Sequence, residues 1–345
     1  MRSYLVTLTP EEPYFFGGER SFKYGAVETT APNTYYITSQ KLPNQTSLLG
    51  ALRYAILNQN GKLATNGSRE AFSPLVGPKS FDLHDPALSF GCIRRLHPLH
   101  LRYEGKPYIP VPANHGMTTD GFQFETFCSS LGEETAIPVN YLAKGHGVKE
   151  DTFLSLEDGQ EVCPISYTVD VGVNLGLLRG QDVEGGFFKK KFCLMEAGWS
   201  FGFYADMDET VVKEGFADHV FMGSGKSTFR MEVRPEENRL EEMTCSCLRR
   251  ITQETQPFWY CLSDLWLRED WKPEGFAIVL ARQTRYLTTR PHEKRFSDSM
   301  KKSKNLYRLI RAGSVFYYNP EHIACYPNGE ILGMNRCIEI KKGMD

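Results

Sequence analysis

The chain has 345 residues, of which 24% are charged and 41% are hydrophobic, and its formal net charge is -2. This length suggests two domains that each bury a core, and the ordinary composition excludes a collagen-like or intrinsically disordered protein. The near-neutral charge excludes a protein that binds nucleic acid through an overall excess of positive charge. Any nucleic-acid site would have to be a local cluster of basic residues. Because no apolar stretch approaches the roughly 20 residues that span a bilayer, we expect no membrane partner.

Residues 1–7 begin directly with alternating apolar side chains and lack the apolar core of a secretory signal, so we expect a cytoplasmic location. The nine cysteines are odd in number, and most of them, Cys261 and Cys337 included, lie singly, as small buried side chains do in cytosolic proteins. Cys245 and Cys247 are too close together for the usual C-x-x-C metal site. We expect neither a metal nor a cofactor.

In the first half, residues 4–8 alternate as a strand does, and Pro10 ends this strand. The clearest helix follows Pro43, with Asn44, Thr46 or Ser47 as its N-cap. Four apolar residues recur there at helical spacing: Leu48, Leu49, Leu52 and Ile56. Gly61 closes the helix, and eight prolines between residues 72 and 141 predict short strands and long loops.

In the second half, apolar or alternating runs predict a series of strands at 167–173, 187–195, 199–204, 219–221, 228–233, 275–280 and 313–318. We expect the strand at 187–195 to pair with its neighbour at 199–204. Many strands with few helices favour an α+β fold of two sheet-and-helix units, with a boundary in the polar stretch at 150–163.

A glycine loop at Gly223–Thr228 resembles the end of a P-loop, which cradles nucleotide phosphates. Val220 stands where the full motif needs glycine, and the following residues alternate like a strand rather than opening a helix. Two interpretations therefore remain: an anion-binding loop in which Lys226 supplies charge, or a plain hairpin turn. A nucleotide-hydrolysing switch that uses Lys226 is the weakest alternative.

A similar segment follows the first strand, where Gly17 and Gly18 precede Arg20 and Lys23 among aromatic residues. Single-stranded nucleic acid is held by this mixture, because rings stack on bases and cations contact phosphates. The alternative is a turn at an aromatic core edge. The start of the helix after Pro43 is a third candidate, since its first amides lack partners within the helix and Lys41 and Arg53 lie near in sequence.

Basic residues are also concentrated between residues 282 and 311, a segment that contains ten lysines and arginines and only two acidic residues. This segment is either one side of an RNA site or a solvated basic face. Catalytic motifs are absent, although His115, His146 and His219 lie in loop-like surroundings and acid–base cleavage of RNA by one of them stays an alternative.

Four segments together resemble a known family: 12–22, 43–53, 220–225 and 311–318. They are similar to the signature segments of the third subunit of the type III-B CRISPR (Cmr) effector, a member of the RAMP superfamily. The chain departs from that pattern in its second glycine loop, which often reads Gly-Gly-Glu in the family and here reads Gly223-Ser224-Gly225-Lys226.

The resemblance implies two tandem ferredoxin-like (RRM-type) domains with long insertions, an N-terminal one over 1–160 and a C-terminal one, with the glycine-rich loop, over 161–345. It implies a non-catalytic antiviral subunit that binds the 5′ handle of the crRNA. The implied protein partners are the large polymerase-type subunit and the RAMP backbone subunits, with target RNA reached indirectly. The alternative is a RAMP-type, metal-independent endoribonuclease that processes guide RNA.

The RNA-binding residues predicted from these patterns are Gly17, Gly18, Arg20, Ser21, Lys23, Lys41, Asn44, Gln45, Thr46, Ser47, Arg53, Gly223, Ser224, Gly225, Lys226, Ser227, Arg282, Arg285, Lys301 and Lys302.

Overall fold

The computed structural model describes residues 1–17, 20–23, 34–63, 73–78, 81, 85, 87–116, 124–128, 134–138, 151–173, 187–212, 214–223, 225–266, 275–284, 307–320 and 327–342.

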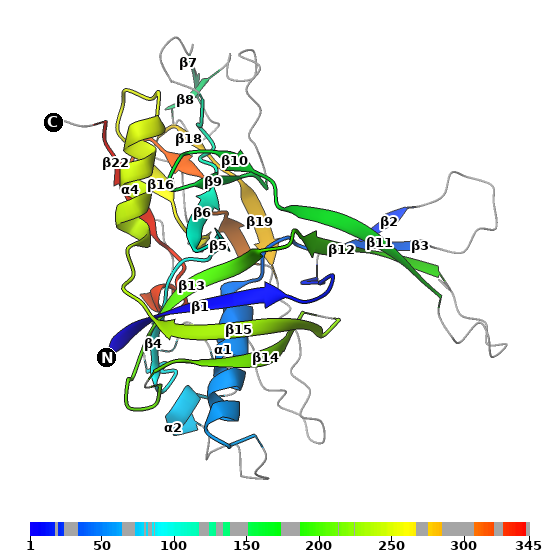
Figure 1. Cartoon of the computed structure of the whole chain (residues 1–345). Coiled ribbons are helices and arrows are strands. Elements are labelled where there is room, and N and C mark those ends of the chain that lie inside the picture. Colours follow the sequence, from blue (N-terminus) through cyan, green and yellow to red (C-terminus); the bar gives the residue numbers. More distant parts are fainter. Residues whose placement is uncertain are drawn as a thin grey trace.

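The largest sheet has nine strands, in the order β10-β9-β6-β5-β13-β1-β15-β14, with β4 also paired to β13 (Figure 1). Its strands are β1 (Arg2–Pro10), β4 (Ile93–Leu96), β5 (His100–Tyr103), β6 (Lys106–Pro110), β9 (Phe153–Ser155), β10 (Glu161–Val162), β13 (Trp199–Met207), β14 (Phe216–Met222) and β15 (Ser227–Pro235). The predicted first strand is confirmed, and it lies between β13 and β15, antiparallel to both.

Helix α1 (Gln45–Gln59) covers one face of this sheet and confirms the predicted helix. Its apolar side chains share a core with Tyr4, Val6 and Leu8, which alternate along β1. Asn44 occupies the N-cap position, where its side chain makes no capping hydrogen bond. Gly61 follows the helix with a φ of +64°, the left-handed conformation that glycine adopts without strain.

A four-stranded sheet projects from the body of the molecule and is called the arm here (Figure 1). It consists of β11 (Ile165–Val173), β12 (Phe187–Met195), β3 (Thr34–Thr38) and β2 (Arg20–Lys23), in that order. Strands β12 and β3 run parallel, with Lys191 opposite Thr38, although 153 positions separate these residues (191 minus 38). The arm therefore joins a segment after β1 to the middle of the chain.

The predicted pairing of the strand at 187–195 with that at 199–204 is wrong. Strand β12 pairs with β11 and β3, whereas β13 pairs with β1, β4 and β5. The burial pattern explains this difference, because Phe201 and Phe203 on β13 are fully buried in the core beneath α1. Sharing that core places β13 beside β1 rather than beside its neighbour in sequence.

Helix α4 (Leu240–Ile251) packs in a second core with the small sheet β18-β21-β16-β22. The strands of that sheet are β16 (Phe258–Cys261), β18 (Ala277–Ile278), β21 (Val315–Phe316) and β22 (Cys337–Ile340). Leu5 and Tyr204 of the large sheet belong to the same core, which ties this layer to the main body. The remaining elements are α2 (Ser73–Val76), β7 (Phe124–Cys128), β8 (Glu134–Pro138), β17 (Leu265–Trp266), β19 (Ala281–Thr284), β20 (Tyr307–Ile310) and η4 (Pro327–Leu332).

The fold is mixed α+β and is dominated by antiparallel sheets, as the sequence predicted. The large sheet takes strands from both sides of residue 160, so the division into domains at 1–160 and 161–345 stays a prediction. None of the helices in the described ranges combines the length and apolar character that a membrane crossing requires.

Candidate nucleic-acid interface

The two glycine-bearing segments predicted from the sequence lie against each other. The backbone amide of Glu11 donates to the carbonyl of Thr228 (3.1 Å), and the amide of Thr228 donates to the Glu12 carboxylate (2.7 Å). The hydroxyl of Ser227 donates to the carbonyl of Pro13 (3.1 Å). The segment after β1 therefore runs along the start of β15, and the buried Ser227 holds the two together.

The turn between β14 and β15 is a tight hairpin that leads into a strand and not into a helix, unlike a P-loop. The amide of Lys226 donates to the carbonyl of Gly223 (3.3 Å), so that amide closes the turn. Gly223 has a φ of +78°, and a Cβ there would lie 2.2 Å from the carbonyl oxygen of Phe15. Close packing thus requires this glycine, while Gly225 and Lys226 are exposed at the tip.

Strand β12 completes the site beside this turn. The Phe192 and Phe15 rings lie 5.4 Å apart, and the Lys190 ammonium is 5.7 Å from the centre of the Phe15 ring. A Cβ on Gly225 would lie 3.8 Å from the Phe192 ring. We call Phe15, Lys190, Phe192, Gly225 and Lys226 the turn cluster. Phe15 is buried and supports the lysine, whereas Phe192 and Lys190 are half-buried.

A second group lies on the opposite face of the arm, because successive side chains of a strand point in opposite directions. The ammonium of Lys191 lies 4.6 Å from the centre of the Tyr167 ring, and that of Lys41 lies 5.2 Å from it. Lys41 also pairs with Asp151 (3.5 Å), which in turn binds Arg311 (3.0 Å). The predicted Lys41 and the 311–318 segment therefore meet at this face.

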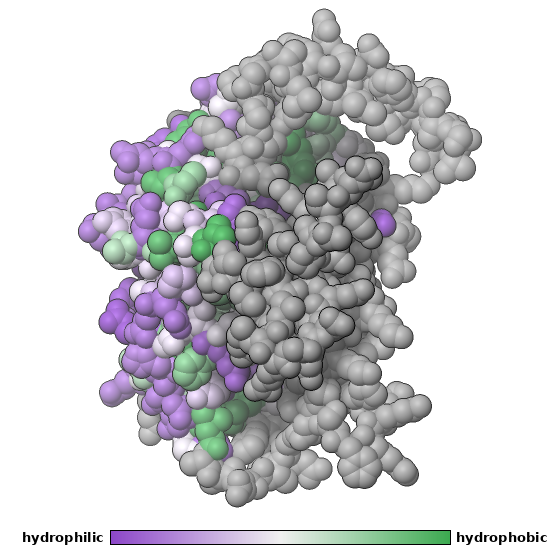
Figure 2. Space-filling model, turned by 90° about the vertical axis from the view of Figure 1, so that its right-hand side faces the viewer, coloured by the Kyte–Doolittle hydropathy of each residue, from purple (hydrophilic) through white to green (hydrophobic). Residues whose placement is uncertain are grey.

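Sequence reasoning missed Lys190, Lys191, Phe192 and Tyr167. The available signal was a run of three lysines between phenylalanines inside an apolar strand. Lysine is uncommon in such a strand, because burying its charge costs free energy. Lysines beside rings, with glycines that permit close approach, match the chemistry that holds single-stranded nucleic acid. Figure 2 shows that hydrophilic residues cover most of the described surface visible from its side, with small apolar patches among them.

The start of α1 makes hydrogen bonds to other segments of the same chain. The Gln45 side-chain amide donates to the carbonyls of His97 (3.4 Å) and Gly333 (3.3 Å). The half-buried Thr46 and Ser47 follow in the first turn. This end of the helix thus contacts the loop before β5 and the segment after η4.

Arg53 lies further along α1, where its guanidinium donates to the carbonyls of Gly77 (2.9 Å) and Pro78 (2.6 Å). The same group lies 5.9 Å from the centre of the Phe90 ring. Burial lowers the pKa of Arg53. These contacts hold the α2 region against the helix.

The other predicted residues divide into three sets. Gly17 has a φ of +75°, and its carbonyl accepts from the amide of Gln40 (3.2 Å). For four more the backbone is described but the side chain is not: Arg20, Ser21 and Lys23 in β2 and Arg282 in β19. Outside the described residues lie Gly18, Ser224, Arg285, Lys301 and Lys302.

Two of the three loop histidines singled out above are described, and each meets a carboxylate. His115 Nε2 lies 3.1 Å from Glu161, and His219 Nε2 lies 3.2 Å from Glu11. His146 lies outside the described residues. Among the described ranges, no three histidine, cysteine or acidic side chains are grouped as a metal site requires.

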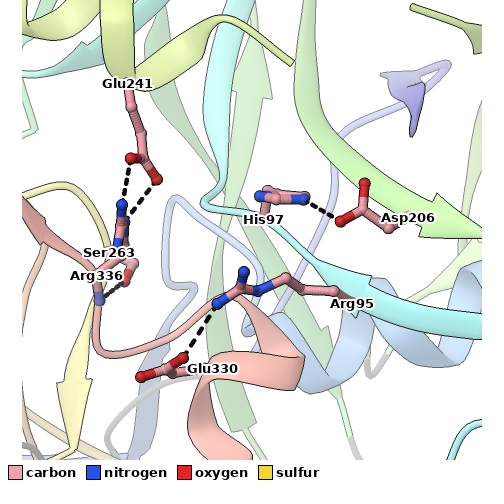
Figure 3. Close-up of polar contacts among 7 residues, drawn as sticks. All are labelled: Arg95, His97, Asp206, Glu241, Ser263, Glu330 and Arg336. Atoms are coloured by element: carbon pink, nitrogen blue, oxygen red, sulfur yellow. Dashed lines mark hydrogen bonds and ion pairs between the residues drawn. The ribbon is translucent and has the colours of Figure 1, made fainter. Parts of the chain in front are cut away.

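A small pocket lies between β4, α4 and η4, and it is lined by ion pairs (Figure 3). Arg95 pairs with Glu330 at 3.1 Å, and Arg336 pairs with Glu241 at 2.5 Å. Because each arginine is matched by a carboxylate, the attraction of this pocket for phosphate is reduced.

Comparison with known proteins gives a structural likeness alone. No protein-family model matches the chain, and no curated protein matches it. Ten chains of solved structures match. One belongs to the type III-B Cmr-beta complex bound to cognate target RNA and AMPPnP, with 12% identity over 91% of this chain and 85% of that chain and a TM-score of 0.46.

A second belongs to type III-B Cmr-beta bound to cognate target RNA, with 10% identity over 91% of this chain and 86% of that chain and a TM-score of 0.43. A third comes from a Csm1-Csm4 cassette in complex with pppApA, with 13% identity over 93% of this chain and 88% of that chain and a TM-score of 0.37. In these three structures the sequence identity is at most 13% and the TM-score at most 0.46.

Proposed function

We propose that this chain is a non-catalytic, RNA-binding subunit of a type III-B CRISPR effector complex, acting in antiviral defence in the cytoplasm. It holds the 5′ handle of the crRNA and contacts the large polymerase-type subunit and the RAMP backbone subunits. Two tandem ferredoxin-like domains, divided near residue 160, belong to the same proposal. One observation carries it: the segment at 12–22 and the hairpin that contains the glycine loop at 220–225, two of the four regions that resemble the family, meet at the turn cluster, beside lysines and aromatic rings.

The chemistry of the turn cluster suits an extended RNA strand. Gly225 has no side chain, so a sugar-phosphate backbone can approach the exposed tip closely. Lys226 and Lys190 supply charge from two different strands, and the half-buried Phe192 offers a ring edge or face to a base. Lys226 is exposed at the tip of the hairpin, and the Lys190 ammonium lies over the Phe15 ring.

An RNA titration tests this proposal. Guide RNA transcribed from the CRISPR array of the source organism is titrated with the wild-type chain and with Lys190→Ala/Lys226→Ala at several salt concentrations. We expect affinity to fall about tenfold and the slope of log affinity against log salt to become shallower by about 1 to 1.5, since two phosphate contacts are lost.

The matched control is Lys106→Ala/Lys341→Ala, which removes two lysines that pair with Glu157 (2.8 Å) and Glu339 (2.9 Å) away from the cluster. The control should bind as the wild type does. Equal affinity and equal salt slope for both double variants would contradict the proposed interface.

The second candidate is the metal-independent endoribonuclease, and the pair between His115 and Glu161 favours it. A histidine oriented by a carboxylate is the arrangement that acid–base cleavage of RNA uses. Incubation of the chain with precursor RNA in EDTA decides between the two functions. Cleavage that disappears in His115→Ala supports the enzyme, and intact RNA with the wild-type chain supports the binding role.

A further inference from the structure

Two cysteines far apart in sequence lie opposite each other on neighbouring strands of the small sheet that packs against α4. Cys261 ends β16 and Cys337 begins β22, and they are direct partners in the antiparallel register. Their sulfur atoms lie 3.5 Å apart. Cys261 is fully buried, while Cys337 is partly exposed.

The backbone places this pair at a site that accepts a disulfide. The amide of Cys261 donates to the carbonyl of Ser314 (2.9 Å), and its own carbonyl accepts from the amide of Gly313 (2.8 Å). Both backbone groups of Cys261 therefore point away from β22, so Cys261 and Cys337 form a non-hydrogen-bonded pair. Such pairs bring Cα atoms to about 4.5 Å, within the range of about 4.4 to 6.8 Å that disulfides require.

The residue before Cys337 is fixed from several directions, as Figure 3 shows. Arg336 donates through its guanidinium to both carboxylate oxygens of Glu241 on α4 (2.6 and 2.5 Å). Its amide donates to the Ser263 hydroxyl (2.9 Å), and its carbonyl accepts from the amide of Leu262 (2.9 Å). The start of β22 is thus held in register with the end of β16.

We propose that Cys261 and Cys337 form a reversible disulfide in the presence of a low-molecular-weight disulfide such as oxidised glutathione. The Cys337 thiolate attacks one glutathione sulfur, which forms a mixed disulfide and releases one glutathione thiolate. The Cys261 thiolate then attacks the Cys337 sulfur and releases the second. The two cysteine protons pass to the two released thiolates, so the cysteine pair loses two electrons and oxidised glutathione is reduced to two molecules of glutathione.

The order of attack follows from the surroundings of the two sulfurs. Burial, and then the neighbouring Cys337 thiol, raise the pKa of Cys261 well above its ordinary value. The buried thiol is therefore the resolving partner, and the partly exposed Cys337 meets the oxidant first. The disulfide would tie β22, and with it the Arg336 contact to α4, covalently to β16.

Peptide mapping of the full chain tests this modification. The reduced protein is freed of reductant, treated with oxidised glutathione, alkylated in denaturant and digested without reduction. We expect a peptide that joins Cys261 to Cys337, an intact mass lower by about two hydrogens, and reversal by dithiothreitol. Oxidation should also raise the melting temperature by several degrees.

Cys163→Ser is the matched control, because Cys163 is an exposed cysteine elsewhere, and it should form the same link. Cys337→Ser should lose both the link and the rise in melting temperature. The wild-type map alone decides the matter if that variant fails to fold. Alkylation of both cysteines after treatment, or a lasting glutathione adduct on Cys337, would overturn the proposal.

Discussion

Two cationic regions of this molecule invite comparison: the part of α1 that carries Arg53, and the turn cluster. The sequence predicted RNA contact at both. In the structure, the Arg53 guanidinium donates hydrogen bonds to two backbone carbonyls, and burial lowers the pKa of Arg53. Lys226 is instead exposed at a hairpin tip, and Lys190 lies over an aromatic ring.

This difference shows that a cation in a predicted site is not enough for ligand binding. The groups that the cation already contacts decide whether it can bind a ligand. A guanidinium that donates to the carbonyl of the buried Gly77 is costly to withdraw, since that acceptor would then lack a donor. Lys226, which is exposed at a hairpin tip, can donate hydrogen bonds to a phosphate without leaving a backbone acceptor unsatisfied. We therefore expect Arg53 to stabilise the fold and Lys190 and Lys226 to bind RNA.

The largest effect is expected at the turn itself, where two glycines differ sharply. Gly223→Ala places a Cβ 2.2 Å from the Phe15 carbonyl oxygen at a φ of +78°, whereas the nearest atoms at Gly225 are 3.8 Å away. We expect Gly223→Ala to destabilise the protein by about 3 kcal/mol and Gly225→Ala by less than about 1 kcal/mol. Chemical denaturation measures both, and equal losses would contradict the packing described here.

A buried histidine extends the contrast between interior and surface charge. His100 is 1% exposed, and burial followed by the nearby Arg102 lowers its pKa to about 3, against a weaker opposing effect of the Pro98 carbonyl. The Nε2 atom has no hydrogen-bond partner among the residues that the structure describes, and the ring stacks on Tyr204.

Because the unfolded chain binds this proton near pH 6.5 and the folded chain does not, stability is complete above that pH and falls below it. We expect a loss of about 2 kcal/mol between pH 7 and pH 5 from this group. His100→Phe should remove that part of the pH dependence in urea denaturation, while His219→Ala, at an exposed position, should retain it. An unchanged pH profile in His100→Phe would show that folding does not lower the pKa of this ring.

The comparison between the two cations is tested directly by one pair of substitutions that keep an apolar stem. Arg53→Met should cost about 2 kcal/mol of stability and leave RNA affinity unchanged, because its donors serve only the fold. Lys190→Met should cost less than about 0.5 kcal/mol and weaken RNA binding several-fold. The two roles are assigned wrongly if the effects on folding and binding are reversed.

The locally encoded elements were predictable from the sequence. Residues 4–8, the helix after Pro43 and the hairpin around Gly223–Lys226 were all found, because alternation, helical spacing and turn residues act over a few positions. The partners of β12 were not, because its parallel contact with β3 depends on chain segments more than a hundred residues apart. Nothing in the local pattern of β12 distinguishes that neighbour from β13.

The candidate site was predictable to the same extent. The glycine segments were identified from their own residues, and their mutual packing was not. Lys190 and Lys191 could not be identified from the sequence, because their contacts are with Phe15 and Tyr167. The fold brings these two rings to opposite faces of one strand. The contacts of Arg53 could not be predicted for a similar reason, because its carbonyl partners lie in a separate segment.

Photocrosslinking tests the central claim most directly. A photoreactive phenylalanine analogue replaces Phe192 in the turn cluster and, as a control, the exposed Tyr54 on α1, and each protein is irradiated in complex with labelled guide RNA. The account predicts an RNA adduct at position 192 and none at position 54. An adduct at position 54 with none at position 192 would contradict it.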